Sequence, residues 1–168
     1  LYVDYIDEVM EHPRREEVLS FIKQRASTRF WQAKKIDDHI IQDILEVAMT
    51  SAVSCNSQTI RFAVKKNIVK KMKVGDSNNQ SMFNKAPVTI YIAEDERFFN
   101  DTFETALDVG SVCSLMMIAA HFYGIKGTWI YQGDYYNDKS LSNELGFSKN
   151  HKIYSLMTLG YPLDKQEK

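Results

Sequence analysis

Two arginines lie four residues apart in the segment Arg25-Ala26-Ser27-Thr28-Arg29, with two hydroxyl groups between them. Guanidinium groups match the geometry of phosphate oxygens and can bind them through paired hydrogen bonds. This segment is therefore a candidate site for a phosphate dianion. From the residues alone, a pair of arginines at a helix end that makes surface ion pairs is the commoner arrangement.

Two further groups of polar residues are expected in turns beside apolar segments, at Ser54 to Gln58 and at Asn78-Asn79-Gln80. Neither group contains the motif of a known hydrolase, metalloprotease or nucleotide-binding loop. The histidines at positions 12, 39, 121 and 151 share no metal-ligand spacing, and His121 has the setting of a core histidine. The sequence therefore indicates that a bound group, rather than a side chain, carries any chemistry.

The two cysteines, Cys55 and Cys113, form neither a zinc-binding pattern nor a disulfide scaffold. We expect Cys55 to be a buried, unreactive thiol, because a free cysteine usually behaves as a small apolar residue. The absence of a disulfide pattern favours a reducing, cytoplasmic setting.

Charge and composition exclude several classes of protein. The chain has 168 residues, 21 Lys and Arg against 22 Asp and Glu, and 44% hydrophobic residues. This composition fits one globular domain, and near-neutral charge argues against an electrostatic nucleic-acid binder. The longest apolar stretch, Val112 to Tyr123, is interrupted by Ser114 and His121 and is shorter than the roughly 20 residues of a membrane span, so we expect none.

The hydrophobic pattern predicts alternating helices and strands that would position these polar segments. Helices are expected from Pro13 to about Arg25, from the N-cap Asp37 to about Ala52, from Asp101 to Tyr123 and from Asp138 to Leu145; strands are expected from Ile60, over Val88 to Ala93, over Thr128 to Tyr131 and over Ile153 to Tyr161. Val88 to Ala93 is apolar on both faces, which is typical of a central strand. The order predicts a single α+β domain over residues 1–168, without the glycine-rich fingerprint of a Rossmann fold.

Five segments in this order resemble motifs of the FMN-dependent nitroreductase family. They are Arg25 to Phe30 (the R-x-S-x-R opening), Ser51 to Phe62 (S-x-x-x-x-N-x-Q-P-W-x-F), Asn79 to Val88 (N-Q followed by A-P-V), Asp108-Val109-Gly110 with Gly124 to Ile130 (D-x-G and G-[LI]-G-[ST]-x-W-I), and Leu159-Gly160-Tyr161-Pro162 (L-G-Y-P). Each motif is short, but together they extend over most of the chain.

The resemblance implies a nitroreductase-like fold, in which a central antiparallel or mixed sheet is flanked by helices and two chains form an intertwined homodimer with FMN at its interface. It implies that Arg25 and Arg29 bind the phosphate and that Ser27 adds a hydroxyl. Ser54, Asn56 and Gln58 would reach a flavin held mainly by the other subunit, and Gln80 would bond to the pyrimidine end of the ring. The full set of cofactor-binding residues expected in this way is Arg25, Ala26, Ser27, Arg29, Ser54, Cys55, Asn56, Gln58, Gln80, Trp129, Ile130 and Tyr131.

Three departures from the family pattern affect this assignment. Thr59-Ile60 replaces the usual Pro-Trp, and Tyr131-Gln132 replaces small residues. The basic residue that in the family often follows L-G-Y-P and reaches the phosphate is not found here, and Lys165 and Lys168 are the only substitutes for it.

Two functions are compatible with these observations. The first is an FMN oxidoreductase that takes a hydride from NAD(P)H and delivers it to a nitroaromatic or quinone by a ping-pong mechanism, since the flavin and not a side chain carries the chemistry. The second is a flavin-binding storage, sensor or accessory protein without reductase turnover, because a fold does not fix a function. For both functions we expect a homodimer, and for neither do we expect a metal, a nucleic acid or a membrane as partner.

Overall fold

A computed structural model of the chain describes residues 14–66, 86–98, 102–131 and 139–163. Its core is a four-stranded antiparallel sheet with the order β1-β2-β4-β3. The strands are β1 (Ile60–Lys66), β2 (Val88–Asp95), β3 (Lys126–Tyr131) and β4 (His151–Gly160); the helices are α2 (Arg15–Lys23), α3 (Asp38–Met49), the 3₁₀ turn η1 (Ser54–Asn56), α5 (Thr102–Phe122) and α6 (Lys139–Glu144). The expected α+β class, with a central antiparallel sheet flanked by helices, is confirmed.

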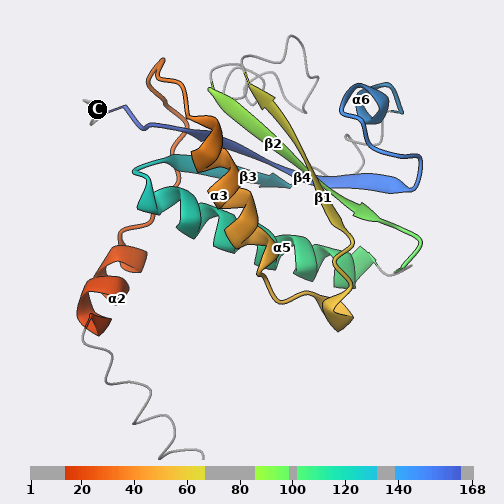
Figure 1. The fold of residues 1–168 in the computed structure, drawn as a ribbon, viewed down its shortest axis with the longest axis horizontal. Coiled ribbons are helices and arrows are strands. Elements are labelled where there is room, and N and C mark those ends of the chain that lie inside the picture. The colour runs from red at the N-terminus through yellow and green to blue at the C-terminus, as the bar shows by residue number, and fades with distance from the viewer. Residues whose placement is uncertain (1–13, 67–85, 99–101, 132–138, 164–168) are drawn as a thin grey trace, which may run out of the picture.

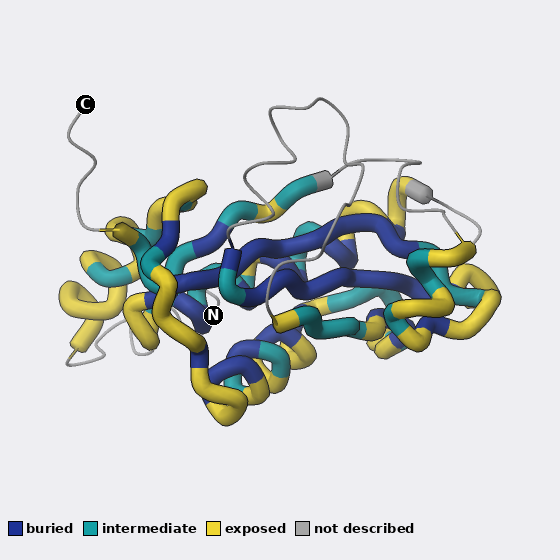
Figure 2. The backbone as a smooth tube through the Cα atoms, turned by 90° about the horizontal axis from the view of Figure 1, so that it is seen from above, coloured by how far each residue is buried: buried dark blue, intermediate teal, exposed yellow. Residues whose placement is uncertain are grey.

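Helices α3 and α5 cover one face of the sheet, and α6 lies beside the opposite face (Figure 1). Ile90 and Ile92 of β2 point into the core beneath α3 and α5, while Tyr91 and Ala93 pack with Phe147 on the other side. Strand β2 is buried along its whole length, and Figure 2 shows both central strands in the buried colour. The apolar run therefore predicted a central strand correctly, since a strand covered on both faces needs no polar alternation.

A bulge interrupts the pairing of β2 with β4, where Ile92 faces Ser155 but Ala93 faces Ile153. Such a bulge re-aims the side chains that follow it. Tyr154 packs into the core beneath α5, and Ser155 lies next to it at the same bend.

Helix α5 is the main support of the core. By length and composition its segment Phe103–Phe122 is apolar enough to cross a membrane, but it packs against α3, β3 and β4 as a core helix does. Met116 and Cys113 on its inner face are completely buried, whereas Phe103, Leu107 and Phe122 are exposed. An apolar helix with an exposed apolar side indicates a surface that a partner could cover.

Candidate functional site

The arginine segment, residues 25–29, is attached to the start of β3. The Thr28 N–H donates a hydrogen bond to the Gly127 carbonyl over 3.2 Å. The Thr128 hydroxyl donates to the Thr28 carbonyl over 2.5 Å. A Cβ on Gly127 would lie 2.1 Å from the Thr158 carbonyl oxygen, so only glycine allows β3 to approach β4 this closely.

The end of β4 holds the chain that follows the arginine segment. Trp31 forms an antiparallel bridge with Pro162, and the Trp31 indole N–H donates to the Lys126 carbonyl over 3.1 Å. Gln32 donates from its backbone to the Tyr161 carbonyl and from its side chain to the Pro162 carbonyl, each over 2.8 Å. The L-G-Y-P segment thus fixes the arginine segment from a second side.

Two adjoining hollows lie along the arginine segment and share Ser27 and Trp129. The larger, with a volume of about 690 Å³, contains Arg29 and Lys126 in its wall. The smaller, of about 380 Å³, has Arg25 in its wall. Their remaining wall residues are Thr28, Phe30, Thr128, Pro162 and Leu163 in the larger and Ile22, Ser114, Met117 and Ile118 in the smaller. We call the pair the arginine hollow; it gathers three cationic side chains and a serine hydroxyl.

The cations of the arginine hollow have no anionic partner in the part of the chain that the structure describes. No Asp or Glu carboxylate there lies within ion-pair distance of Arg25, Arg29 or Lys126. The arrangement is thus not the surface ion-pair cluster that the residues alone favoured. A phosphate dianion would supply the missing charge.

Lys126 is a residue that the sequence analysis missed. It precedes Gly127 in strand β3, where a lysine looks like an ordinary strand-edge residue. The two lysines that the sequence offered as phosphate ligands, Lys165 and Lys168, lie outside the described residues. Only the contact of β3 with the arginine segment reveals Lys126 as a candidate.

Trp129 is held in one orientation at the boundary of the arginine hollow. Its indole N–H donates to the Ser155 hydroxyl over 2.5 Å, and that hydroxyl donates to the Ile130 carbonyl over 2.8 Å. The ring passes over Gly110 of α5, where a Cβ would lie 3.4 Å from its Cη2 atom. With 39% of its surface exposed, Trp129 offers a fixed aromatic surface to a planar ligand.

The neighbours of Trp129 face elsewhere. The Ile130 side chain packs on the opposite face of the sheet beside Phe147, so at the Trp129 face it offers only backbone atoms. The backbone of Tyr131 pairs with Ser155 at the end of β3. Ala26 is exposed between the arginines and brings no polar side-chain group, and Gln80 lies outside the described residues.

The second part of the expected site, the loop Ser54–Gln58, has an unusual backbone. Cys55, Asn56 and Gln58 have φ angles of 53°, 51° and 50°, in the left-handed region. For residues other than glycine this conformation costs about 1 kcal/mol or more each. The loop therefore needs strong attachments to keep its shape.

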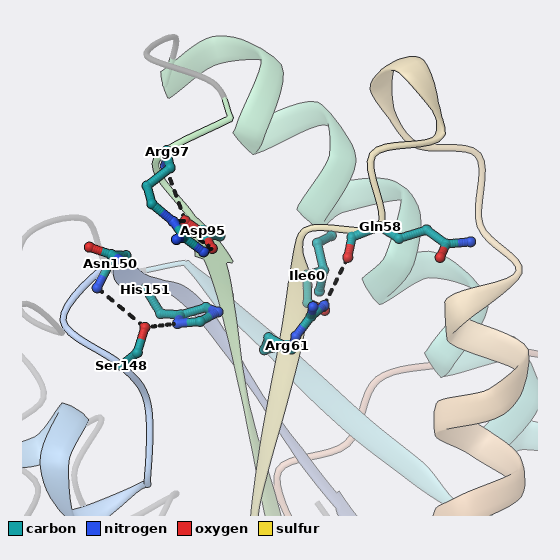
Figure 3. Close-up of polar contacts among 8 residues, drawn as sticks. All are labelled: Gln58, Ile60, Arg61, Asp95, Arg97, Ser148, Asn150 and His151. Carbon is teal, nitrogen blue, oxygen red and sulfur yellow. Dashed lines mark hydrogen bonds and ion pairs between the residues drawn. The ribbon is translucent and has the colours of Figure 1, made fainter.

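The buried carboxylate of Asp108 on α5 is the first attachment. It accepts hydrogen bonds from the Ser54 N–H at 2.9 and 3.0 Å and from the Ser54 hydroxyl at 3.0 Å. At the other end of the loop, Arg61 donates to the Gln58 carbonyl over 2.8 Å, as Figure 3 shows. The side chains of Cys55, Asn56 and Gln58 are left exposed.

The expectation of a buried Cys55 thiol is wrong for the single chain. Cys55 is exposed and lies in the left-handed part of the loop, which is held to the rest of the chain through Ser54. Cys113 is the buried thiol; burial raises its pKa to about 12. Cys55 is therefore the thiol that solvent can reach in the described chain.

The two parts of the site lie toward opposite ends of α5 (Figure 1). The loop is bonded to Asp108, whereas Arg25 shares its hollow with Met117 and Ile118. Ten residues of helix between Asp108 and Ile118 correspond to about 15 Å. One chain therefore does not bring its loop Ser54–Gln58 to its own arginine segment.

Other features of the described residues offer less chemistry. A hollow of about 490 Å³ between α3 and β1 is lined mainly by apolar groups such as Ile41 and Leu45, and its Lys66 is paired with Asp38. Across the described ranges no group of three or more His, Cys, Asp or Glu residues could hold a metal ion. A further hollow of about 400 Å³ beside α6 contains lysines, but it also contains the carboxylate of Glu96, which is paired with Lys152. The arginine hollow has no such carboxylate among its described wall residues and is therefore our candidate for an anionic ligand.

Comparison with known proteins identifies the family of the chain. Residues 65–161, more than half of the chain, match the nitroreductase family. The chain belongs to the nitroreductase family. The resemblance inferred from the sequence motifs is thereby confirmed, although the matched range excludes the arginine segment and the loop Ser54–Gln58.

Individual members of the family are similar over nearly the whole chain. An Archaeoglobus fulgidus protein with the provisional name NADH dehydrogenase/NAD(P)H nitroreductase is 28% identical over 158 residues, 90% of this chain and 89% of the relative. A nitroreductase from Bacteroides fragilis, solved with bound FMN, has a TM-score of 0.73 and 24% identity, covering 90% of this chain and 94% of its own. Another with bound FMN, from Desulfitobacterium hafniense, has a TM-score of 0.71 and 22% identity, covering 89% and 91%.

Proposed function

We propose that this nitroreductase-family protein is an FMN-dependent oxidoreductase that uses NAD(P)H. The observation that carries the proposal is the arginine hollow, whose two adjoining parts are lined by Arg25 and by Arg29 with Lys126, none of which has a carboxylate partner among the described residues. FMN ends in a phosphate dianion and carries a planar ring, and Trp129 offers an exposed aromatic surface beside the cations. The FMN bound to the Bacteroides and Desulfitobacterium relatives supports the same ligand.

Each candidate residue has a distinct role in this proposal. Arg25, Arg29 and Lys126 neutralise the phosphate, and Ser27 donates its hydroxyl to the phosphate or the ribityl chain. The backbone of Ile130 and Tyr131 follows the ring, with the Tyr131 N–H near the position that carries the hydride. Gln80 is proposed for the pyrimidine end on the family resemblance alone.

We infer that the site is completed by a second copy of the chain. The exposed residues Phe103, Leu107, Ser114 and Phe122 recur along α5 at intervals of four, seven and eight residues, which keeps them near one side of the helix. A two-fold contact along this side would bring the loop Ser54–Gln58 of one subunit toward the arginine hollow of the other. The separation of both parts along α5 favours this homodimer.

When bound, FMN supplies hydride acceptance and release, and the protein supplies binding, orientation and electrostatics. A donor and an acceptor that use the same exposed face of the ring in turn give a ping-pong mechanism. A nitroaromatic or quinone acceptor is proposed from the family. Both cysteines are free, which fits the reducing conditions of the cytoplasm.

The visible spectrum of the purified protein is the first test. We expect a yellow protein, or one that binds added FMN, and oxidation of NADH or NADPH in the presence of a quinone with parallel initial-rate plots. Protein that neither contains nor binds FMN would refute the proposal. FMN binding without pyridine-nucleotide oxidation would point to the storage or sensor function instead.

A further inference from the structure

Glu94 of β2 is a buried acid that packing alone does not explain. It is 1% exposed, its Oε1 atom accepts one hydrogen bond, and its Oε2 atom has no partner among the described residues. Burying a polar group without its full set of hydrogen bonds is unfavourable, and an apolar side chain would fill the same space without this loss. The hydrogen bond that the Glu94 carboxyl accepts therefore has to account for its presence in the core.

What Glu94 touches is the end of the loop Ser54–Gln58. The buried Thr59 hydroxyl donates to Oε1 of Glu94 over 2.8 Å, and the Ser57 hydroxyl lies 3.2 Å from that of Thr59. A hydroxyl has a single proton, so Thr59 accepts from Ser57 while it donates to Glu94. The bonds form a directed chain from the loop to the buried carboxyl.

Two buried carboxyl groups thus hold the two ends of the loop Ser54–Gln58 through hydrogen bonds. Asp108 of α5 holds Ser54 at its start, and Glu94 of β2 holds Ser57 through Thr59 at its end. The left-handed residues Cys55 and Asn56 lie between these attachments. Since such a backbone is unfavourable outside glycine, both ends have to be fixed to maintain it.

We propose that Glu94 is a positioning residue, which acts through Thr59 and Ser57 to hold the loop Ser54–Gln58 in the shape that faces the flavin of the partner subunit. The inference rests on the proposed function, because that function gives the loop its ligand. The carboxylate of the adjacent Asp95 is not part of the hydrogen-bond chain from Ser57 to Glu94, because it is bonded to Arg97 (Figure 3).

The test compares Glu94→Leu with the isosteric Glu94→Gln. Leucine removes the acceptor, so the amides of residues 54–59 should exchange with deuterium about tenfold faster or more in the flavin-free protein. FMN should bind about tenfold more weakly to the same variant, while its melting temperature stays equal or rises because a buried polar group is gone. Glutamine keeps the acceptor oxygen and should restore both properties to within about threefold of the wild type.

Thr59→Val should reproduce the effects of Glu94→Leu, because it breaks the same chain at its middle. Thr89→Val provides the matched control, since Thr89 is a buried threonine of β2 that takes no part in the chain. Unchanged exchange at residues 54–59 in Glu94→Leu would overturn the inference, and so would FMN affinity within twofold of the wild type. A wild-type protein that binds no FMN would instead refute the proposed function, and the exchange data would still decide whether Glu94 holds the loop.

Discussion

Trp129 and Ser155 are diagonal neighbours on the paired strands β3 and β4, and the Trp129 indole N–H donates to the Ser155 hydroxyl over 2.5 Å. Ser155 is completely buried, directly after the bulge in the β2–β4 pairing. The hydroxyl also donates to the Ile130 carbonyl, so one serine fixes both the aromatic surface and the next backbone group. The serine that orients the exposed ring of Trp129 therefore lies directly beside the bulge in the β2–β4 pairing.

We expect Ser155→Ala to release Trp129. The lost hydrogen bond leaves the indole N–H without its partner, and FMN affinity should fall by about 1 kcal/mol, roughly fivefold. Tryptophan fluorescence should shift as well; the only other tryptophan, Trp31, is buried and keeps its own bond to Lys126. Ser148→Ala, at an exposed turn bonded to His151, is the control. Equal FMN affinity in both variants would contradict the orienting role.

Removing the cations of the arginine hollow should weaken FMN without unfolding the chain. Arg25→Ala or Arg29→Ala each removes a charge-assisted hydrogen bond, worth about 1.5 to 3 kcal/mol. Lys126→Met should have a smaller effect, because an ammonium is a more strongly hydrated point charge. Titration of flavin fluorescence measures all three, with Arg15→Ala on α2 as control. A double Arg25/Arg29 variant that binds FMN normally would show that the phosphate lies elsewhere.

Leu107→Asp should disrupt the proposed dimer while the subunit stays folded. Leu107 is 57% exposed on α5, so the single chain tolerates a charge there, whereas a dimer interface would bury it unpaired. Sedimentation should give a species near 19.5 kDa, and FMN should be lost because the partner's loop is absent. Val47→Asp, at an exposed apolar position of α3, is the control and should remain dimeric. If Leu107→Asp sediments like the wild type, the interface lies on another surface.

The hydrophobic pattern predicted the helices and strands more accurately than it predicted which of their residues are exposed. Asp37 is the residue before α3, as expected, although its side chain makes no capping hydrogen bond. The strand expected from Ile60 begins at that residue and extends to Lys66. Helix α5 is apolar on every side, so its pattern did not distinguish Met116, completely buried inside the chain, from the exposed Leu107. A charge at Met116 would unfold the subunit rather than test the dimer.

Long-range contacts account for the site residues that the sequence analysis missed. Lys126, Ser155 and Glu94 match no short motif, and each gains its role from a partner at least 26 residues away or from a hollow formed by distant segments. The arginine segment was identifiable because two guanidinium groups and a serine lie within five residues. The separation of the two parts of the site along α5 depends on packing, which no local pattern encodes.

The ion pair of Asp95 with Arg97 makes stability depend on acid pH. Arg97 donates to both carboxylate oxygens, at 2.9 Å from Nε and 2.5 Å from Nη2 (Figure 3), and these bonds lower the pKa of Asp95 to about 2. An aspartate in the unfolded chain titrates near 3.9, so the folded state binds the proton less readily. The contribution is therefore complete above about pH 4 and is lost as the pH falls toward about 2.

Arg97→Gln should remove most of this pH dependence. We expect its free energy of unfolding in urea to lie below that of the wild type at pH 5 to 7, and the difference to shrink between about pH 4 and about pH 2, where Asp95 becomes protonated in both proteins. Lys152→Gln is the control, since the ammonium of Lys152 lies 3.8 Å from Glu96, a longer and weaker pair. A difference between Arg97→Gln and wild type that stays constant from pH 7 to pH 2 would mean that Arg97 stabilises the turn after β2 by packing, and that the Asp95 carboxylate gains nothing from its charge.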